Sequence, residues 1–266
     1  MPNDKGSSPK LAVEVPFEWA AQKVLGPTLD KLGQDFAGLY AKGRDKIIEV
    51  ARKKTKNIDD KGQTNFRVSK DVFWNGSFTD ESICAEYFGG ILASSRTSDG
   101  KDDAGIYYLD IIKSLSSDQL HLHYVIYNSL NKILAGDSSK KEVNIGRSDE
   151  VQALPIWFPT IELILILRLK IDTDLEALYR KGLIYEYAVD GQKRDGKSDL
   201  RYTKVVPTTL GVHLYMVAFN CLNEWRDFPK KDFGNFEDIV LPKYKTSTLE
   251  KLVELSLNDQ HFPSLG

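Results

Sequence analysis

Two adjacent glycines stand inside an apolar helical segment, and this feature strongly constrains how the chain can fold. The stretch TDESICAEYFGGILASSR (79–96) opens with a hydroxyl and two acids, which suit the N-terminus of a helix. Because glycine inside a helix costs about 1 kcal/mol relative to alanine, two in a row need a reason. The residues that remove side-chain bulk here are Gly89, Gly90, Ala93 and Ser94. We interpret them as a helix-packing site, with a groove for a ligand or partner as the alternative.

Helical patterns flank this segment in the first half of the chain. Apolar residues from Leu25 to Val50 recur at steps of three and four, which predicts a helix with a basic C-terminal end. A short helix is expected over 106–115. The capping-box spacing at 116–119 then begins a long helix that ends at Ala135, before a glycine. We expect this long helix to pass close to Gly90.

Two other stretches lack a clear helical period. The apolar residues of 66–78 alternate loosely, which predicts an extended connector. Beyond Trp225 the sequence is polar until TSTLEKLVELSL (246–257), where we expect a short terminal helix. The apolar run 156–167 contains a proline and a glutamate and is shorter than the roughly 20 residues that a bilayer requires, so we interpret it as part of the core.

The second half shows the element order of a winged helix-turn-helix. A helix over 174–180 ends at Gly182, and strands over 183–189 and 202–206 flank a glycine-containing turn. Thr208 or Thr209 then caps an apolar helix that runs through Cys221. The residues predicted to form the small core of this module are Leu183, Ile184, Tyr202 and Leu210.

The sequence therefore predicts a mainly α protein with a helical N-terminal domain and a C-terminal winged helix-turn-helix-like module that contains a β-hairpin. The predicted divisions are a disordered leader (1–15), the helical domain (16–136), a linker (137–150), the winged-helix-like domain (151–225) and a tail with a short terminal helix (226–266).

Charge argues against strong nucleic-acid binding. The net charge of −2 gives no global basic field. The candidate contacts to nucleic acid are Lys193, Arg194, Lys197 and Arg201 in the turn between the strands. However, Asp172, Asp174 and Glu176 at the entry of the preceding helix would repel phosphates, so we expect at most weak binding. The basic helix end, within 28–56, could contact a membrane surface, although a solvated helix end with favourable macrodipole charge is the simpler interpretation.

No residue pattern in the sequence indicates an enzyme. The chain lacks the motifs of serine hydrolases, phosphate-binding loops, dinucleotide-binding folds and zinc proteases. His121 and His123 are two residues apart, so on a helix they point in different directions and do not form a metal site. Cys84 and Cys221 are expected to be free thiols in a reducing cytoplasm, since the polar N-terminus shows no export signal. We therefore expect no cofactor, no metal and no catalytic residue.

Short motifs follow one another along the chain in a particular order: LGPTLDKLG (25–33), TDESICAEYFGGILASS (79–95), LDIIKSLSSDQL (109–120), GLIYEY (182–187) and TTLGVHLYMVAFNC (208–221). In this order they resemble the abortive infection alpha family of bacterial phage-resistance proteins. Gly89 and Gly90 stand where the family often has a polar residue. The resemblance implies a non-enzymatic phage-defence protein that acts through protein-protein interaction or self-assembly. The alternative is a winged-helix regulator that binds nucleic acid.

Overall fold

The structure is a computed structural model that describes residues 26–55, 62–79, 81–137, 142–167, 170–194 and 199–259. Its helices are α2 (Gly26–Lys54), α3 (Phe66–Gly76), α4 (Ser82–Ser94), α5 (Gly105–Ile112), α6 (Ser117–Ala135), α7 (Ser148–Gln152), α8 (Thr160–Leu167), α9 (Ile171–Arg180), α10 (Thr209–Ala218), the 3-10 helix η2 (Leu222–Asp227) and α11 (Leu249–Asn258). The strands are β1 (Gln63–Thr64), β2 (Arg96–Thr97), β3 (Ile156–Pro159), β4 (Ile184–Arg194) and β5 (Asp199–Pro207). The predicted mainly helical character is confirmed. The predicted leader, 1–15, lies outside the described residues.

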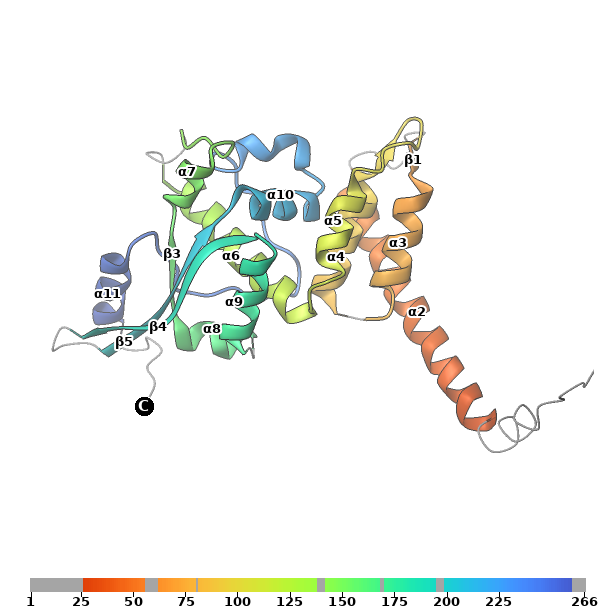
Figure 1. Cartoon of the computed structure of the whole chain (residues 1–266), viewed down its shortest axis with the longest axis horizontal. Coiled ribbons are helices and arrows are strands. Elements are labelled where there is room, and N and C mark those ends of the chain that lie inside the picture. The colour runs from red at the N-terminus through yellow and green to blue at the C-terminus, as the bar shows by residue number, and fades with distance from the viewer. Residues whose placement is uncertain are drawn as a thin grey trace, which may run out of the picture.

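The first helices form a bundle at one end of the molecule, with α2, α3, α4 and α5 side by side (Figure 1). Helix α4 packs along α2, and the N-terminal part of α2 projects away from the body. The predicted extended connector at 66–78 is wrong, because this stretch forms α3. Asn65 caps it by accepting hydrogen bonds from the backbone amides of Arg67 and Val68, and Val68 and Val72, four residues apart, face the core.

Helix α6 runs through the middle of the molecule and is buried along most of its length. Its predicted start is confirmed. The Ser116 hydroxyl accepts a hydrogen bond from the Gln119 amide, and the Gln119 side chain accepts one from the Ser116 amide. The helix ends at Ala135, as predicted, with Gly136 after it. Because nearly every side of α6 meets another element, it organises the core from both halves of the sequence.

A small antiparallel sheet follows, with the strand order β3-β5-β4. The predicted helix, hairpin and helix are present as α9, β4, β5 and α10. Gly182 has φ of +68°, a left-handed conformation that ends α9, and the Thr208 hydroxyl caps α10 by accepting from the Gly211 amide. Helix α10 ends at Ala218, so Cys221 lies beyond it. The structure shows small sheets among helices; the winged helix-turn-helix assignment stays a prediction.

The predicted core of the hairpin is correct in part. Leu183 and Ile184 are buried, and Leu210 packs against the same large cluster. Tyr202 instead packs in a separate cluster with Trp157 and residues of the C-terminal segment, because β3 pairs with β5 and brings the Trp157 ring 5.1 Å from that of Tyr202. The sheet therefore contacts two clusters of buried residues.

The predicted polar tail contains a segment that enters the core. Residues 228–236, here called the C-terminal strap, run along α6, and Phe228 and Phe236 are buried. The Asn131 amide donates to the carbonyls of Phe228 and Lys231, both at 2.8 Å. The expected terminal helix is present as α11, capped by the Thr248 hydroxyl.

One large cluster of buried side chains extends from α2 through α4 and α6 to α10 and the strap. It includes residues from both sides of the predicted linker, such as Ile47, Leu130 and Val212. The division into a domain at 16–136 and one at 151–225 remains a prediction. None of the described helices combines the length and apolarity needed to cross a membrane.

Candidate functional site

The glycine pair of α4 lies against two different helices. A Cβ atom on Gly89 would lie 2.7 Å from Val50 of α2, and one on Gly90 would lie 2.3 Å from the Ala218 carbonyl oxygen at the end of α10. Real Cβ atoms do not approach other atoms so closely, so both positions require glycine or a local shift. The close approach expected at Gly90 is present, but its partner is α10 and not residues 120–134 of α6. Each glycine therefore admits one neighbouring helix.

Beside Gly90, a largely buried lysine joins four parts of the chain. The Lys54 ammonium forms an ion pair with Glu86 of α4 and donates to the carbonyls of Glu86 (2.8 Å) and Ala218 (2.7 Å). It also lies 4.5 Å from the ring centre of Phe236 in the strap. Burial lowers the pKa of Lys54 to about 8, against the opposing effect of Glu86. We call Lys54 and Glu86 the charged centre.

A second buried polar group contains neutral side chains. The Tyr87 hydroxyl is hydrogen-bonded to Nδ1 of His123 at 2.5 Å, and the His123 ring lies 4.6 Å from that of Tyr127. The Tyr127 hydroxyl donates to the Leu183 carbonyl and accepts from the Thr208 amide. Burial lowers the pKa of His123 to about 3, so the imidazole is neutral near pH 7. We call Tyr87, His123 and Tyr127 the neutral centre; it links α4, α6 and the start of α10.

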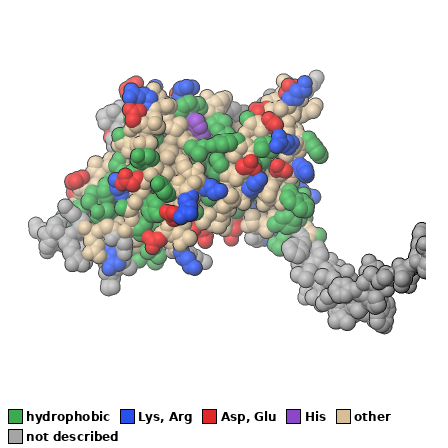
Figure 2. Space-filling view, viewed as in Figure 1, with side chains coloured by type: hydrophobic (Ala, Val, Ile, Leu, Met, Phe, Trp, Pro, Cys, Tyr) green, Lys and Arg blue, Asp and Glu red, His purple; other side chains and the backbone are tan. Residues whose placement is uncertain are grey.

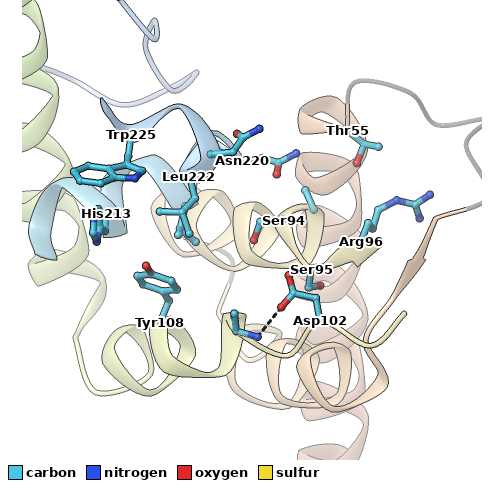
Figure 3. Close-up of a pocket in the computed structure, with 15 residues that line it drawn as sticks. Thr55, Ser94, Ser95, Arg96, Asp102, Tyr108, His213, Asn220, Leu222 and Trp225 are labelled. Carbon is cyan, nitrogen blue, oxygen red and sulfur yellow. Dashed lines mark hydrogen bonds between the residues drawn. The ribbon is translucent and has the colours of Figure 1, made fainter. Parts of the chain in front are cut away.

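A cleft of about 710 Å³ opens where the C-terminal ends of α2, α4 and α10 meet α5 and η2. The side chains that line it are Thr55, Ala93, Ser94, Ser95, Arg96, Asp102, Ala104, Tyr108, His213, Val217, Asn220, Leu222, Asn223 and Trp225. Figure 3 shows Trp225, His213 and Tyr108 at one end and Arg96 at the other, with Ser94, Leu222 and Asn220 between them. Of the predicted small-residue site, Ala93 and Ser94 line this cleft, whereas Gly89 and Gly90 are covered by helices.

The aromatic end of the cleft is held by ring contacts. His213 of α10 meets the Trp225 ring edge-to-face at 4.6 Å, and the Arg226 guanidinium lies 4.4 Å from the centre of the same indole. Burial lowers the pKa of His213, and the nearby Arg226 charge lowers it further, so this imidazole is neutral at pH 7. The Nε2 atom of His213 is buried without a hydrogen bond. This end therefore offers aromatic rings, with the Arg226 charge against the indole.

Aromatic side chains also gather on the outside of the helical bundle. Phe78 lies 5.5 Å from Tyr40 and 6.0 Å from Trp74, measured between ring centres. Trp74 is 68% exposed, and Phe78 and Leu39 are each more than two-fifths exposed. Hydrophobic side chains gather around the base of the projecting α2 in the space-filling view (Figure 2). We call Leu39, Tyr40, Trp74 and Phe78 the aromatic surface.

The nucleic-acid contacts stay a prediction, because most of their side chains lie outside what the structure describes. Arg201 lies in β5, and Lys193 and Arg194 lie in β4, where the backbone alone is described. Lys197 is outside the described residues. The basic end of α2 is also engaged within the chain, since Lys54 is buried and Lys53 pairs with Glu49 and Glu237.

Two of the three acids at the start of α9, Asp174 and Glu176, contact the protein itself. Asp174 accepts a hydrogen bond from the Gln119 side chain of α6 at 3.1 Å. Glu176 accepts from the Tyr187 hydroxyl and from Arg180, both at 2.7 Å, and these hydrogen bonds lower its pKa. This arrangement agrees with a packing role for α9.

The described residues contain no group of three or more histidine, cysteine, aspartate or glutamate side chains that could hold a metal ion. Cys84 and Cys221 are free thiols. Cys84 is buried, and burial raises its pKa to about 12, so it is not a reactive thiolate at neutral pH. The partly exposed Cys221 lies just beyond α10.

Comparison of the chain with protein-family models, curated proteins and solved structures found no match. The resemblance to the abortive infection alpha family therefore depends on the quoted motifs. The sequence reasoning missed the cleft because its residues come from segments far apart in the chain, from Thr55 to Trp225. It also missed the aromatic surface, because its side chains come from α2, from α3 and from Phe78 in the turn after α3.

Proposed function

We propose that this chain is a non-enzymatic phage-defence protein that acts by binding a second protein, either a partner or another copy of itself. The defence role rests on the resemblance of the ordered motifs. The aromatic surface supports the binding role. Exposed tryptophan and other large aromatic side chains are enriched among the residues that dominate protein-protein interfaces.

The aromatic surface is suited to this role because its rings are exposed yet already ordered. Contacts among Tyr40, Trp74 and Phe78 fix the rings against one another, so binding would cost little side-chain entropy. Contiguous apolar area of this kind on a folded protein marks interaction sites more often than isolated exposed residues do. The nucleic-acid alternative has less support, because Lys53 and Lys54 at the basic end of α2 form ion pairs within the chain.

The test is a double substitution, Trp74→Ala with Phe78→Ala, in cells challenged with phage. We expect protection to weaken, so that the efficiency of plating on cells with the double variant is at least about tenfold higher than on cells with the wild type. A tenfold change is what the loss of a single hot spot produces in binding. The matched control is Tyr185→Ala, which removes an exposed ring from β4 and should leave protection unchanged. Equal melting temperatures of the three proteins would show that folding is not the cause.

Light scattering of the purified protein then separates the two modes of binding. If the protein self-assembles, the double variant should have a lower mass than the wild type at the same concentration. If it binds another protein, both should have the same mass, and a partner should be recovered from infected cells with the wild type alone. Full protection by the double variant would contradict the proposed role of the aromatic surface.

A further inference from the structure

The cleft beside α4 and α10 is separate from the aromatic surface and has the size of a small-ligand site. Its volume of about 710 Å³ lies within the range typical of such sites, roughly 300–1,000 Å³. Such sites combine apolar walls with a small number of polar groups that orient the ligand. The polar groups of the cleft that have no partner elsewhere in the described residues therefore indicate which class of ligand it suits.

Two hydrogen-bond donors at the aromatic end have no partner in the described part of the chain. They are the Tyr108 hydroxyl and the indole N–H of Trp225, and both side chains are partly exposed. Figure 3 shows the Tyr108 hydroxyl turned toward His213 and Leu222. Burial raises the pKa of Tyr108, so this hydroxyl keeps its proton at neutral pH. The exposed Asn223 at the start of η2 adds a side-chain amide that also lacks a partner among these residues.

Hydrogen-bond acceptors line the middle of the cleft (Figure 3). Asn220 follows α10 in the left-handed conformation, with φ of +55°, and its side chain donates to the Lys54 carbonyl at 2.9 Å. This hydrogen bond holds the amide in place and leaves its oxygen as an acceptor. One Asp102 oxygen accepts from the Ala104 amide at 2.9 Å, and the other has no partner among the described residues.

The charges in and beside the cleft favour an uncharged ligand. The Asp102 carboxylate would repel an anion. The Arg226 guanidinium, 4.4 Å from the centre of the Trp225 ring, would repel a cation. His213 is neutral at pH 7, because burial and the nearby Arg226 charge lower its pKa. An ion of either sign would therefore meet a like charge, whereas a neutral ligand would not.

The Trp225 ring is already in contact with other groups of the protein. His213 meets it edge-to-face at 4.6 Å, and Arg226 lies over it, so the indole is held in one position before any ligand binds. A flat aromatic ligand needs a free ring face on which to stack. A ligand that instead bonds to the indole N–H and to the neighbouring hydroxyl and amide groups needs several hydroxyl groups of its own, because a hydroxyl both donates and accepts.

We propose that the cleft binds an uncharged mono- or disaccharide, whose hydroxyl groups accept from Tyr108, Trp225 and Asn223 and donate to Asn220 and Asp102. A sugar supplies closely spaced hydroxyl groups that match this mixture of donors and acceptors, and its C–H groups suit the apolar side chains that line the rest of the cleft. The proposal does not depend on the aromatic surface or on a role in phage defence. A defect in sugar binding and a defect in protein binding can therefore be measured separately.

The experiment is calorimetric titration of the full chain with the neutral sugars glucose, galactose, mannose, maltose and lactose. We expect at least one of them to bind with a Kd below about 1 mM. The uronic acids and amino sugars of the same series should bind more weakly, by about tenfold, because each carries a charge that the cleft repels. Indole, which tests the aromatic alternative, should also bind more weakly than the sugar. If no neutral sugar bound at this strength, or if indole or a charged derivative bound as tightly, the proposal would be overturned.

Two substitutions locate the site. Tyr108→Phe removes only the hydroxyl and should weaken sugar binding by about threefold to tenfold, the usual range for the loss of a neutral hydrogen bond. The matched control is Tyr107→Phe, which removes the hydroxyl of the adjacent, exposed tyrosine outside the cleft and should leave binding unchanged. Asn223→Ala, at an exposed position, provides a second test that does not threaten the fold and should weaken binding to a similar extent. Undiminished sugar binding in Asn223→Ala and in a folded Tyr108→Phe protein would place the sugar elsewhere and contradict the proposal.

Discussion

The neutral centre around His123 and the charged centre around Lys54 both lie in the core between α4 and α10, but they stabilise it in different ways. In the neutral centre, tyrosine hydroxyls and an imidazole hydrogen-bond to one another and to backbone groups. In the charged centre, an ammonium and a carboxylate are each about one-seventh exposed and depend on one another. The two centres are therefore neighbours in the fold, but one is held by neutral hydrogen bonds and the other by an ion pair.

The difference lies in what happens when one partner is removed. A neutral hydrogen bond contributes about 0.5–1.5 kcal/mol, and its loss leaves an unsatisfied dipole. A buried charge that loses its counterion is far more costly, because the desolvation penalty is then no longer offset. The charged centre should therefore be more sensitive to substitution and to pH than the neutral centre.

The largest expected effect is that of Glu86→Leu, which leaves the buried Lys54 ammonium without its carboxylate. We expect the free energy of unfolding to fall by about 3–5 kcal/mol, measured by urea denaturation at pH 7. The control, Glu237→Leu, breaks an exposed pair with Lys53, which solvent screens, and should cost far less stability than Glu86→Leu. If the two variants lost equal stability, Glu86 would not be the counterion on which Lys54 depends.

A smaller effect is expected at Gly90, which lies against the Ala218 carbonyl that also accepts from Lys54. Gly90→Ala should destabilise the protein by about 1–3 kcal/mol, because the added methyl group meets backbone that cannot easily move. Gly38→Ala is the matched control: nothing lies within 4 Å of its added Cβ in α2, so helix propensity should give up to about 1 kcal/mol of stabilisation. The melting temperatures of the two variants, each compared with the wild type, measure this difference in stability. A Gly90→Ala protein more stable than the wild type would contradict the close contact.

The smallest effect is the pH dependence of the charged centre. Because the pKa of Lys54 is lowered to about 8 in the folded state, the unfolded chain binds more protons between pH 8 and the ordinary lysine value of 10.5. The contribution of Lys54 to stability should therefore rise with pH in this window, by about 1 kcal/mol from pH 8 to pH 9. The measurement is the difference in unfolding free energy between the wild type and Lys54→Met at each pH.

The neutral centre supplies the control for that measurement. The difference between the wild type and Tyr87→Phe should stay constant from pH 7 to pH 9, because His123 remains neutral throughout and burial raises the pKa of Tyr87. A flat profile for Lys54→Met would show that its ammonium is not desolvated as the structure indicates. A pH-dependent profile for Tyr87→Phe would remove the contrast between the two centres.

Parts of this fold with local signals could be predicted from the sequence. The capping box before α6, the left-handed Gly182 after α9 and the Thr208 cap of α10 are each encoded within a few residues. The helix α3 was missed although Asn65 and the spacing of Val68 and Val72 encode it, because the loose alternation was given more weight.

Other features had no local signal. The pairing of Gly90 with α10, and not with α6, is decided by contacts between segments more than a hundred residues apart. The cleft combines residues from Thr55 to Trp225, none of which forms a recognisable motif with its sequence neighbours. The small side chains of α4 predicted that something packs closely there, but not which helix does so.

The C-terminal strap also has a consequence for the order in which the protein is made. Asn131 bonds to Phe228, 97 residues later in the chain, and the Tyr124 hydroxyl accepts from the Phe236 amide, 112 residues later. During translation, α6 is therefore synthesised well before the residues that cover it. Until the strap has emerged, this side of α6 faces water, and the nascent chain carries an incompletely closed core. Closure of the core must therefore wait until about a hundred residues beyond α6 have been synthesised.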